Sequence, residues 1–119
     1  MNRTINFRMW DINTKRFYYM YLDELIGLTR TISIPKDATI QQYTGLTDKN
    51  GKEIFEGDII IDTQKQKYEI IFDENYARYD IKVCGENKLR GQTSYFTQIY
   101  EKKHIEVIGN IFEHSELLN

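Results

Sequence analysis

The chain has 119 residues, of which 40% are hydrophobic and 29% are charged. This length predicts one domain spanning residues 1–119, and the mixed composition excludes wholesale disorder. Sixteen basic and eighteen acidic residues give a net charge of −2, which argues against binding driven mainly by nucleic-acid phosphates. No apolar run approaches the roughly 20 residues of a membrane-spanning helix, so we expect no membrane association.

Cysteine content and the N-terminal residues both favour a cytoplasmic protein. The single cysteine, Cys84, has no partner for an internal disulfide. The first residues lack the basic start and apolar stretch of a secretion signal. The chain has one proline and two alanines but nine tyrosines and six phenylalanines. Because alanine favours helices and aromatic residues favour strands, this composition predicts a mainly β protein.

The start of the chain predicts a β-hairpin. Residues 5–9 alternate apolar and polar side chains, residues 11–15 contain turn formers, and residues 17–21 have the composition of a second strand. Residues 22–29 then place apolar side chains at helical spacing. Gly27 limits this segment to one or two helical turns.

The rest of the chain predicts short strands separated by turns. The clearest turn signal is Asn50-Gly51, because both residues tolerate positive φ. We expect Ser115 to cap a final helical turn. Near-regular strand spacing favours a coiled or barrel-like (SH3-like) antiparallel sheet with an N-terminal hairpin and minor helix. The strand segments are residues 40–46, 59–62, 68–72, 79–83, 95–100 and 104–108.

A central block, residues 42–60, combines carboxylates with glycines spaced six residues apart. A calcium loop of the EF-hand type needs an oxygen ligand at its fifth position and glycine at its sixth. Counted from Asp48, these positions hold Lys52 and Glu53, so we expect no metal. Charges that alternate in sign also create no single-sign field. We therefore predict a structural turn block formed by Gly45, Asp48, Asn50, Gly51, Gly57 and Asp58.

Catalytic candidates are few. Nucleophilic catalysis by Cys84 requires a neighbouring histidine, and the sequence places neither His104 nor His114 beside it. The two histidines also lack the spacing of a helical metal pair. No phosphate loop, dinucleotide fingerprint or nucleophile elbow is present. We therefore expect neither enzymatic activity nor a cofactor.

Three segments, residues 7–11, 42–60 and 106–113, together resemble the YopX family of small phage and prophage proteins of Gram-positive bacteria. The resemblance implies a β-rich coiled-sheet fold that can assemble into oligomers. It also implies a location in the host bacterial cytoplasm. The family has no established biochemical activity, so the resemblance implies no mechanism.

The N-terminal hairpin combines aromatic residues with the chain's only local excess of basic residues. Tyrosine, tryptophan and arginine are typical of protein interfaces, and rings on a sheet can also stack unpaired bases. We expect a non-enzymatic, homo-oligomeric binding module for a host or phage protein. The alternative is single-stranded nucleic-acid binding by the hairpin, with an enzyme third. The predicted binding residues are Arg8, Trp10, Lys15, Arg16, Tyr18 and Tyr19.

Overall fold

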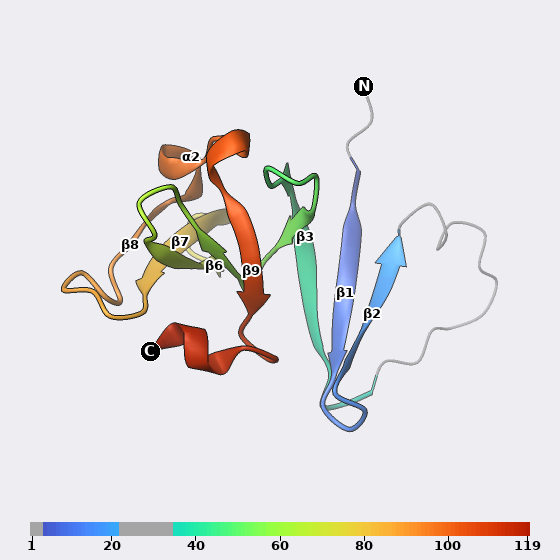
Figure 1. The fold of residues 1–119 in the computed structure, drawn as a ribbon. Helices are drawn as coiled ribbons and strands as arrows, with labels where there is room; N and C mark the ends of the chain where they lie inside the picture. The colour runs from blue at the N-terminus through green and yellow to red at the C-terminus, as the bar shows by residue number, and fades with distance from the viewer. Residues whose placement is uncertain (1–3, 22–34) are drawn as a thin grey trace.

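The computed structural model describes residues 4–21 and 35–119, which form mainly antiparallel strands (Figure 1). The mainly β prediction is therefore confirmed. No helix in the described residues has the length and apolar character needed to cross a membrane. The elements are β1 (Asn6–Asp11), β2 (Arg16–Tyr21), β3 (Thr39–Thr47), β4 (Glu53–Phe55), β5 (Asp58–Ile61), β6 (Lys67–Asp73), β7 (Arg78–Cys84), β8 (Thr93–Tyr95), α2 (Phe96–Ile99), η1 (Lys102–His104), β9 (Glu106–Asn110) and η2 (Ser115–Leu118).

The N-terminal sheet has the strand order β2-β1-β3-β4. Its first two strands form the predicted hairpin, with Asn6 opposite Tyr21 and Asp11 opposite Arg16. The hairpin turn is closed by Lys15, whose φ is 56° and whose amide N–H donates to the Asp11 carbonyl over 2.7 Å.

Strand β3 has two partners along its length. Its first half pairs with β1, and its second half pairs with β4. The register shifts between Tyr43 and Thr47, where Gly45 has a φ of 92°. Glycine adopts this conformation without a Cβ clash, so β3 bulges here. Beyond the bulge, Leu46 packs against the core of the second sheet.

The second sheet has the order β8-β7-β6-β5-β9. Its end strands do not pair with each other in the described residues, so the sheet does not close into a barrel. One face packs on the main core, where Ile70 lies opposite Ile81 across β6 and β7. The buried core residues are Ile54, Ile60, Ile70, Ile81, Phe96, Ile105 and Val107.

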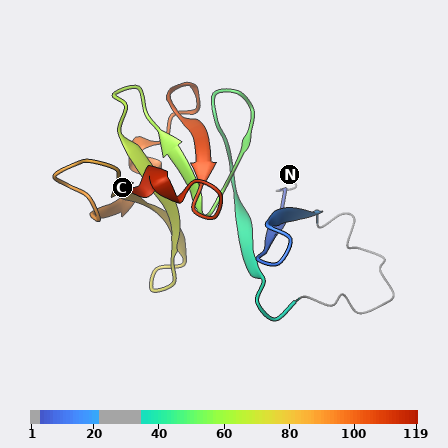
Figure 2. The same ribbon diagram turned by 60° about the horizontal axis from the view of Figure 1, so that its bottom comes forward.

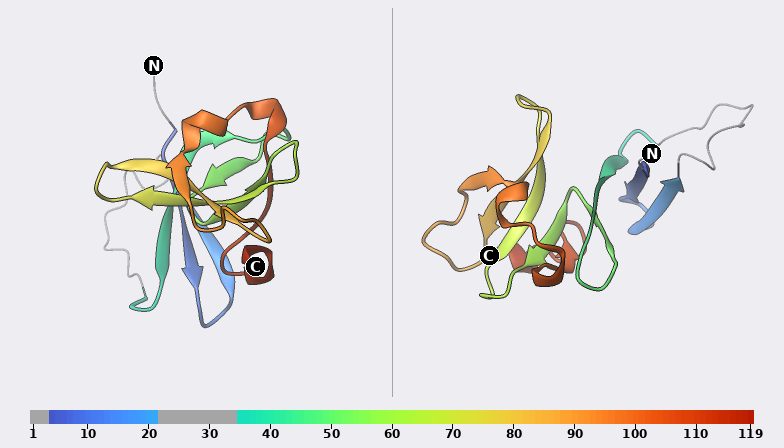
Figure 3. Two further views of the ribbon diagram at one scale, coloured as in Figure 1. Left: turned by 90° about the vertical axis from the view of Figure 1, so that its left-hand side faces the viewer. Right: turned by 90° about the horizontal axis from the view of Figure 1, so that it is seen from above.

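The two sheets stand side by side, as the right-hand view of Figure 3 shows. The turn between β4 and β5 joins them. In this turn the Glu56 N–H donates to the Gln42 carbonyl of β3, and the Gly57 N–H donates to the Ile70 carbonyl of β6. The C-terminal segment with η2 lies next to the second sheet (Figure 2), and the Gly57 carbonyl accepts the Ile111 N–H.

Four local features differ from the predictions. The strand expected at residues 104–108 begins later, because His104 ends η1 and β9 spans Glu106–Asn110. Residues 95–100 do not form one strand, because α2 begins at Phe96 and turns this ring into the core. Ser115 is the first residue of η2 rather than its cap. The three-residue strand β4 was not predicted, since it is too short to show an alternating pattern. The helix expected within residues 22–29 lies outside the described residues.

Candidate functional site

Arg8 lies at the junction of the two sheets and is only 4% exposed. Its Nη1 is 2.8 Å from Asp58 Oδ1, its Nε donates to Gln41 Oε1 over 2.9 Å, and its Nη2 donates to the Glu56 carbonyl. The guanidinium also lies over the Phe17 ring, 4.3 Å from its centroid. These contacts occupy the guanidinium group of Arg8 inside the fold. The prediction that Arg8 lies on a binding surface is therefore wrong.

Asp58 is the buried partner of Arg8. Burial raises the pKa of its carboxyl group, while the Arg8 charge and the Phe55 N–H lower it. The second carboxylate oxygen accepts that Phe55 N–H over 2.8 Å. A buried carboxylate with an ion-pair partner and a backbone donor stabilises a fixed geometry, and losing either contact is costly.

Trp10 is also buried at the junction, with 8% of its surface exposed. Its ring stacks on Phe112, with centroids 5.1 Å apart and an interplanar angle of 9°. Phe17 packs against it at 4.9 Å. Trp10 therefore joins β1 to the segment after β9, and the expectation that it forms a surface contact is wrong.

The other four predicted binding residues are exposed on the hairpin. Tyr18 and Tyr19 are 44% and 49% exposed, on opposite faces of β2. Tyr19 leans over the edge of the junction, 5.8 Å from the Phe55 ring. Lys15 lies in the turn and Arg16 begins β2 opposite Asp11. Four of the six predicted binding residues are thus exposed, whereas Arg8 and Trp10 are buried.

The side of the N-terminal sheet turned away from the second sheet is mainly apolar, and Gln42 beside Phe7 is a polar residue on it. Because Arg8 and Trp10 face the junction, their neighbours Phe7 and Met9 point to the opposite side. Cross-strand pairing places Met20 beside Phe7. It also places both Tyr18 and Ile40 beside Met9, and Ile40 is exposed. We call this set, Phe7, Met9, Tyr18, Met20 and Ile40, the outer face.

One edge of the outer face is open. Strand β2 ends the sheet, and no strand of the described residues pairs with its free edge. Unpaired strand edges offer backbone donors and acceptors to a further strand. Exposed apolar side chains beside such an edge are typical of an interaction surface.

Asp48 organises the central turn. One carboxylate oxygen accepts the N–H groups of Asn50 and Lys52, each over 2.9 Å, and the other accepts the Val107 N–H of β9. The Lys49 N–H also donates to the Ile105 carbonyl. Asp48 is buried, and its contacts are those of a turn tied to a strand. These contacts support the structural interpretation of the block, which substitution can test.

Cys84 is buried at the end of β7. Burial raises the pKa of its thiol, and the nearby Glu69 raises it further, which opposes formation of the nucleophilic thiolate. His104 Nδ1 lies 3.2 Å from Glu101, and His114 Nδ1 accepts the Asn110 N–H. Among the described residues, no three metal-ligating side chains are placed to share an ion.

The sequence interpretation overlooked one surface, the exposed side of β7. Arg78 there lies between the rings of Tyr76 and Tyr95. The alternation of Arg78, Asp80 and Lys82 with apolar residues was visible in the sequence and indicated a polar face, on which Lys82 is exposed and Asp80 is buried. The aromatic partners come from a turn and from β8, so strand periodicity could not show that they meet.

Comparisons with known proteins agree with this fold. The family model described as YopX protein matches residues 20–119. The chain belongs to the YopX family. This confirms the resemblance seen in the sequence, although β1 and the hairpin turn precede the matched residues.

Among solved structures, this YopX-family chain is similar to the crystal structure of protein EF1440 from Enterococcus faecalis. The two share 22% sequence identity and a TM-score of 0.61, with 97% of this chain and 98% of that chain covered. At this identity the similarity supports a common fold and nothing more. No curated protein matches the chain.

Proposed function

We propose that this YopX-family protein is a phage- or prophage-encoded accessory protein that acts by binding rather than catalysis. It self-associates through the N-terminal sheet and binds a host or phage protein in the bacterial cytoplasm. The observation that carries this proposal is the outer face, where apolar side chains lie on three paired strands next to the open edge of β2.

A second copy of the chain fits this surface by its chemistry. It supplies both a strand for the open edge and an equivalent apolar face. At the rim, Asp11 and Arg16 lie opposite each other at the end of the hairpin, so their opposite charges offset each other within one copy. Lys15 in the turn adds one exposed positive charge beside them.

Two further observations support this proposal over its alternatives. The raised pKa of Cys84 leaves its thiol poorly suited to nucleophilic catalysis. The alternative of nucleic-acid binding by the hairpin is weakened, because two of the six predicted binding residues, Arg8 and Trp10, are buried. The exposed hairpin residues keep aromatic rings, which suit a protein interface.

Light scattering at micromolar concentration tests self-association. We expect the wild-type protein to exceed the mass of one chain, and Tyr18→Glu and Ile40→Glu to reduce it to one chain, because each buries a charge in the contact. Tyr76→Glu is the matched control, since Tyr76 is an exposed aromatic residue in the turn between β6 and β7 of the second sheet. A monomeric wild-type protein, or equal loss of association in the control, would contradict the proposal.

A further inference from the structure

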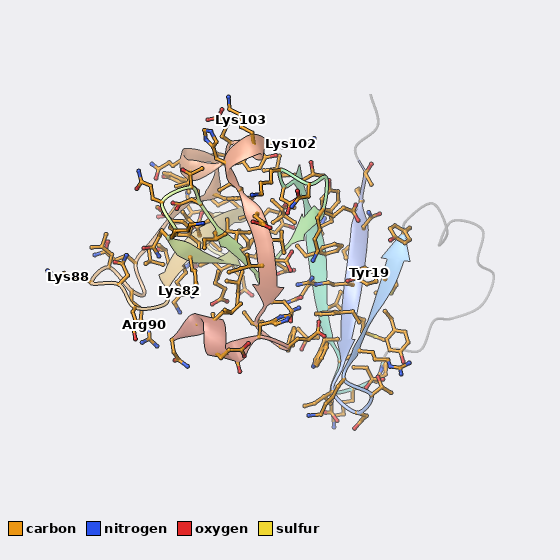
Figure 4. All side chains as sticks on the ribbon, viewed as in Figure 1. Tyr19, Lys82, Lys88, Arg90, Lys102 and Lys103 are labelled. Carbon is orange, nitrogen blue, oxygen red and sulfur yellow. The ribbon has the colours of Figure 1, made fainter. Side chains whose placement is uncertain are left out.

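The face of the second sheet opposite its core carries a row of cations and rings. Arg78, Asp80 and Lys82 alternate along β7, so they point to the same side. On this side Lys82 is exposed, Arg78 is half-buried and Asp80 is buried. Cross-strand pairing places Tyr95 beside Asp80. The loop after β7 returns to this side, because Arg90 and Lys82 line one open hollow of about 530 Å³. Figure 4 shows Lys82, Lys88 and Arg90 on β7 and this loop.

Arg78 fixes two exposed rings. Its guanidinium carbon lies 3.9 Å from the centroid of Tyr95 and 4.4 Å from that of Tyr76. Its Nε is held 2.9 Å from Asp80 Oδ1. Tyr76 and Tyr95 remain 68% and 45% exposed. Two rings held by one planar cation form a stacking platform that loses little conformational entropy when a flat ligand binds.

The hollow beside this platform has an excess of positive charge. Lys82 and Arg90 line it and Lys67 lies beside it, and none of these three forms a salt bridge among the described residues. One acidic residue, Glu69, lines the hollow opposite Lys82, and Glu86 lies in the loop. Asp73 and Asp80 lie beside Arg78 of the platform, and their charges act on Arg78. Burial raises the pKa of Glu69, while the charge of Lys82 lowers it.

The geometry points to a binding site for single-stranded nucleic acid on this face, independent of self-association by the N-terminal sheet. Bases stack on Tyr95 and Tyr76, and the backbone phosphates contact Lys82 and Arg90. Thr93 lies opposite Lys82 and is two residues from Tyr95, a separation of about 7 Å along a strand. One short segment can therefore contact both the rings and the cations. Exposed rings beside solvent-accessible cations are the combination that recognises single strands without sequence preference.

Fluorescence anisotropy with a labelled 12-nucleotide single-stranded DNA tests this site. We expect binding at low salt that weakens as salt rises. Tyr95→Leu should lower affinity about tenfold or more, because one stacked base is lost. The double variant Lys82→Glu/Arg90→Glu should weaken binding and reduce the salt slope by about 2. All changed side chains are exposed, and circular dichroism checks that each variant is folded.

The matched control changes the other exposed cluster of rings and cations, with Tyr18→Leu and Arg16→Glu in the hairpin. These variants should bind the DNA as the wild type does. The proposed site would be overturned if the wild-type protein did not bind the DNA at low salt. It would also be overturned if the hairpin variants lost as much affinity for the DNA as the variants of the site. Stronger binding of duplex DNA of the same length, or complete displacement by polyglutamate at an equal concentration of charge, also overturns it, because neither ligand offers unpaired bases to the rings.

Discussion

Arg8 is the residue on which the junction between the sheets depends most. Its replacement by leucine leaves the Asp58 carboxylate buried without its ion-pair partner, and such losses cost about 3–5 kcal/mol. We expect Arg8→Leu to lower the free energy of unfolding by this order at pH 7, measured by denaturant titration. Asp58→Asn in the same background should restore part of the loss, because the buried charge is then removed.

The pH dependence of this effect has a defined sign. Burial raises the pKa of Asp58 in the folded state, so the folded protein holds this proton more tightly than the unfolded chain. Stability therefore falls as pH rises from the unfolded pKa through the folded pKa. Removing Arg8, whose charge lowers this pKa, widens that window. The loss in Arg8→Leu should be smaller at pH 4.5 than at pH 7, and an equal loss without rescue would contradict the ion-pair account.

Residue patterns alone predicted which side chains of β1 share a face, but not which face is buried. Alternation places Arg8 and Trp10 together, as observed. Their burial depends on Asp58 and Phe112, which lie about 50 and 100 positions later in the chain. A single polar residue between apolar neighbours in the sequence does not indicate which distant residue it will contact in the fold. The candidate surface was therefore predicted in part, through Tyr18 and its neighbours in the hairpin.

At the scale of elements, long alternating segments were predictable and short ones were not. Strands β6 and β7 appear where the sequence placed residues 68–72 and 79–83. The strand β4 has three residues and is defined by its neighbours, since Phe55 pairs with Tyr43 of β3. The segment after β8 contains strand-favouring residues but forms α2, because a helical turn buries Phe96 in the core. Tertiary packing here overrides local preference.

Gly57 joins the two sheets at the turn between β4 and β5. Its φ is 83°, and an added Cβ would overlap the Gln41 side chain, which accepts a hydrogen bond from Arg8. Gly51 has a similar φ of 81° but open space around it. We expect Gly51→Ala to cost about 1–2 kcal/mol through backbone strain alone, and Gly57→Ala to cost clearly more. Thermal unfolding measures both, and equal losses would contradict a role for the Gln41 contact.

At the scale of the molecule, the two sheets meet in two places. The main core packs residues of the second sheet against Ile54 of β4 and Leu46 of β3, whereas the rings of Trp10, Phe17 and Phe112 meet between the sheets. The composition predicted the β class correctly. It could not predict that the strands divide into two sheets, because this division depends on the bulge in β3 and on the turn at Gly57.

We expect the junction to make the two sheets unfold as one cooperative unit, and the single tryptophan can report this. Trp10 lies at the junction, so its fluorescence follows separation of the sheets, whereas far-ultraviolet circular dichroism follows the strands of both. We expect the two signals to give superimposable denaturant curves, as in two-state unfolding. The Tyr18→Glu variant should be used for this measurement. Self-association of the wild-type protein would make the midpoint of the denaturant curve depend on protein concentration. A fluorescence transition at lower denaturant than the dichroism transition would show that the N-terminal sheet separates first, and the buried Arg8–Asp58 contact would then not couple the two sheets.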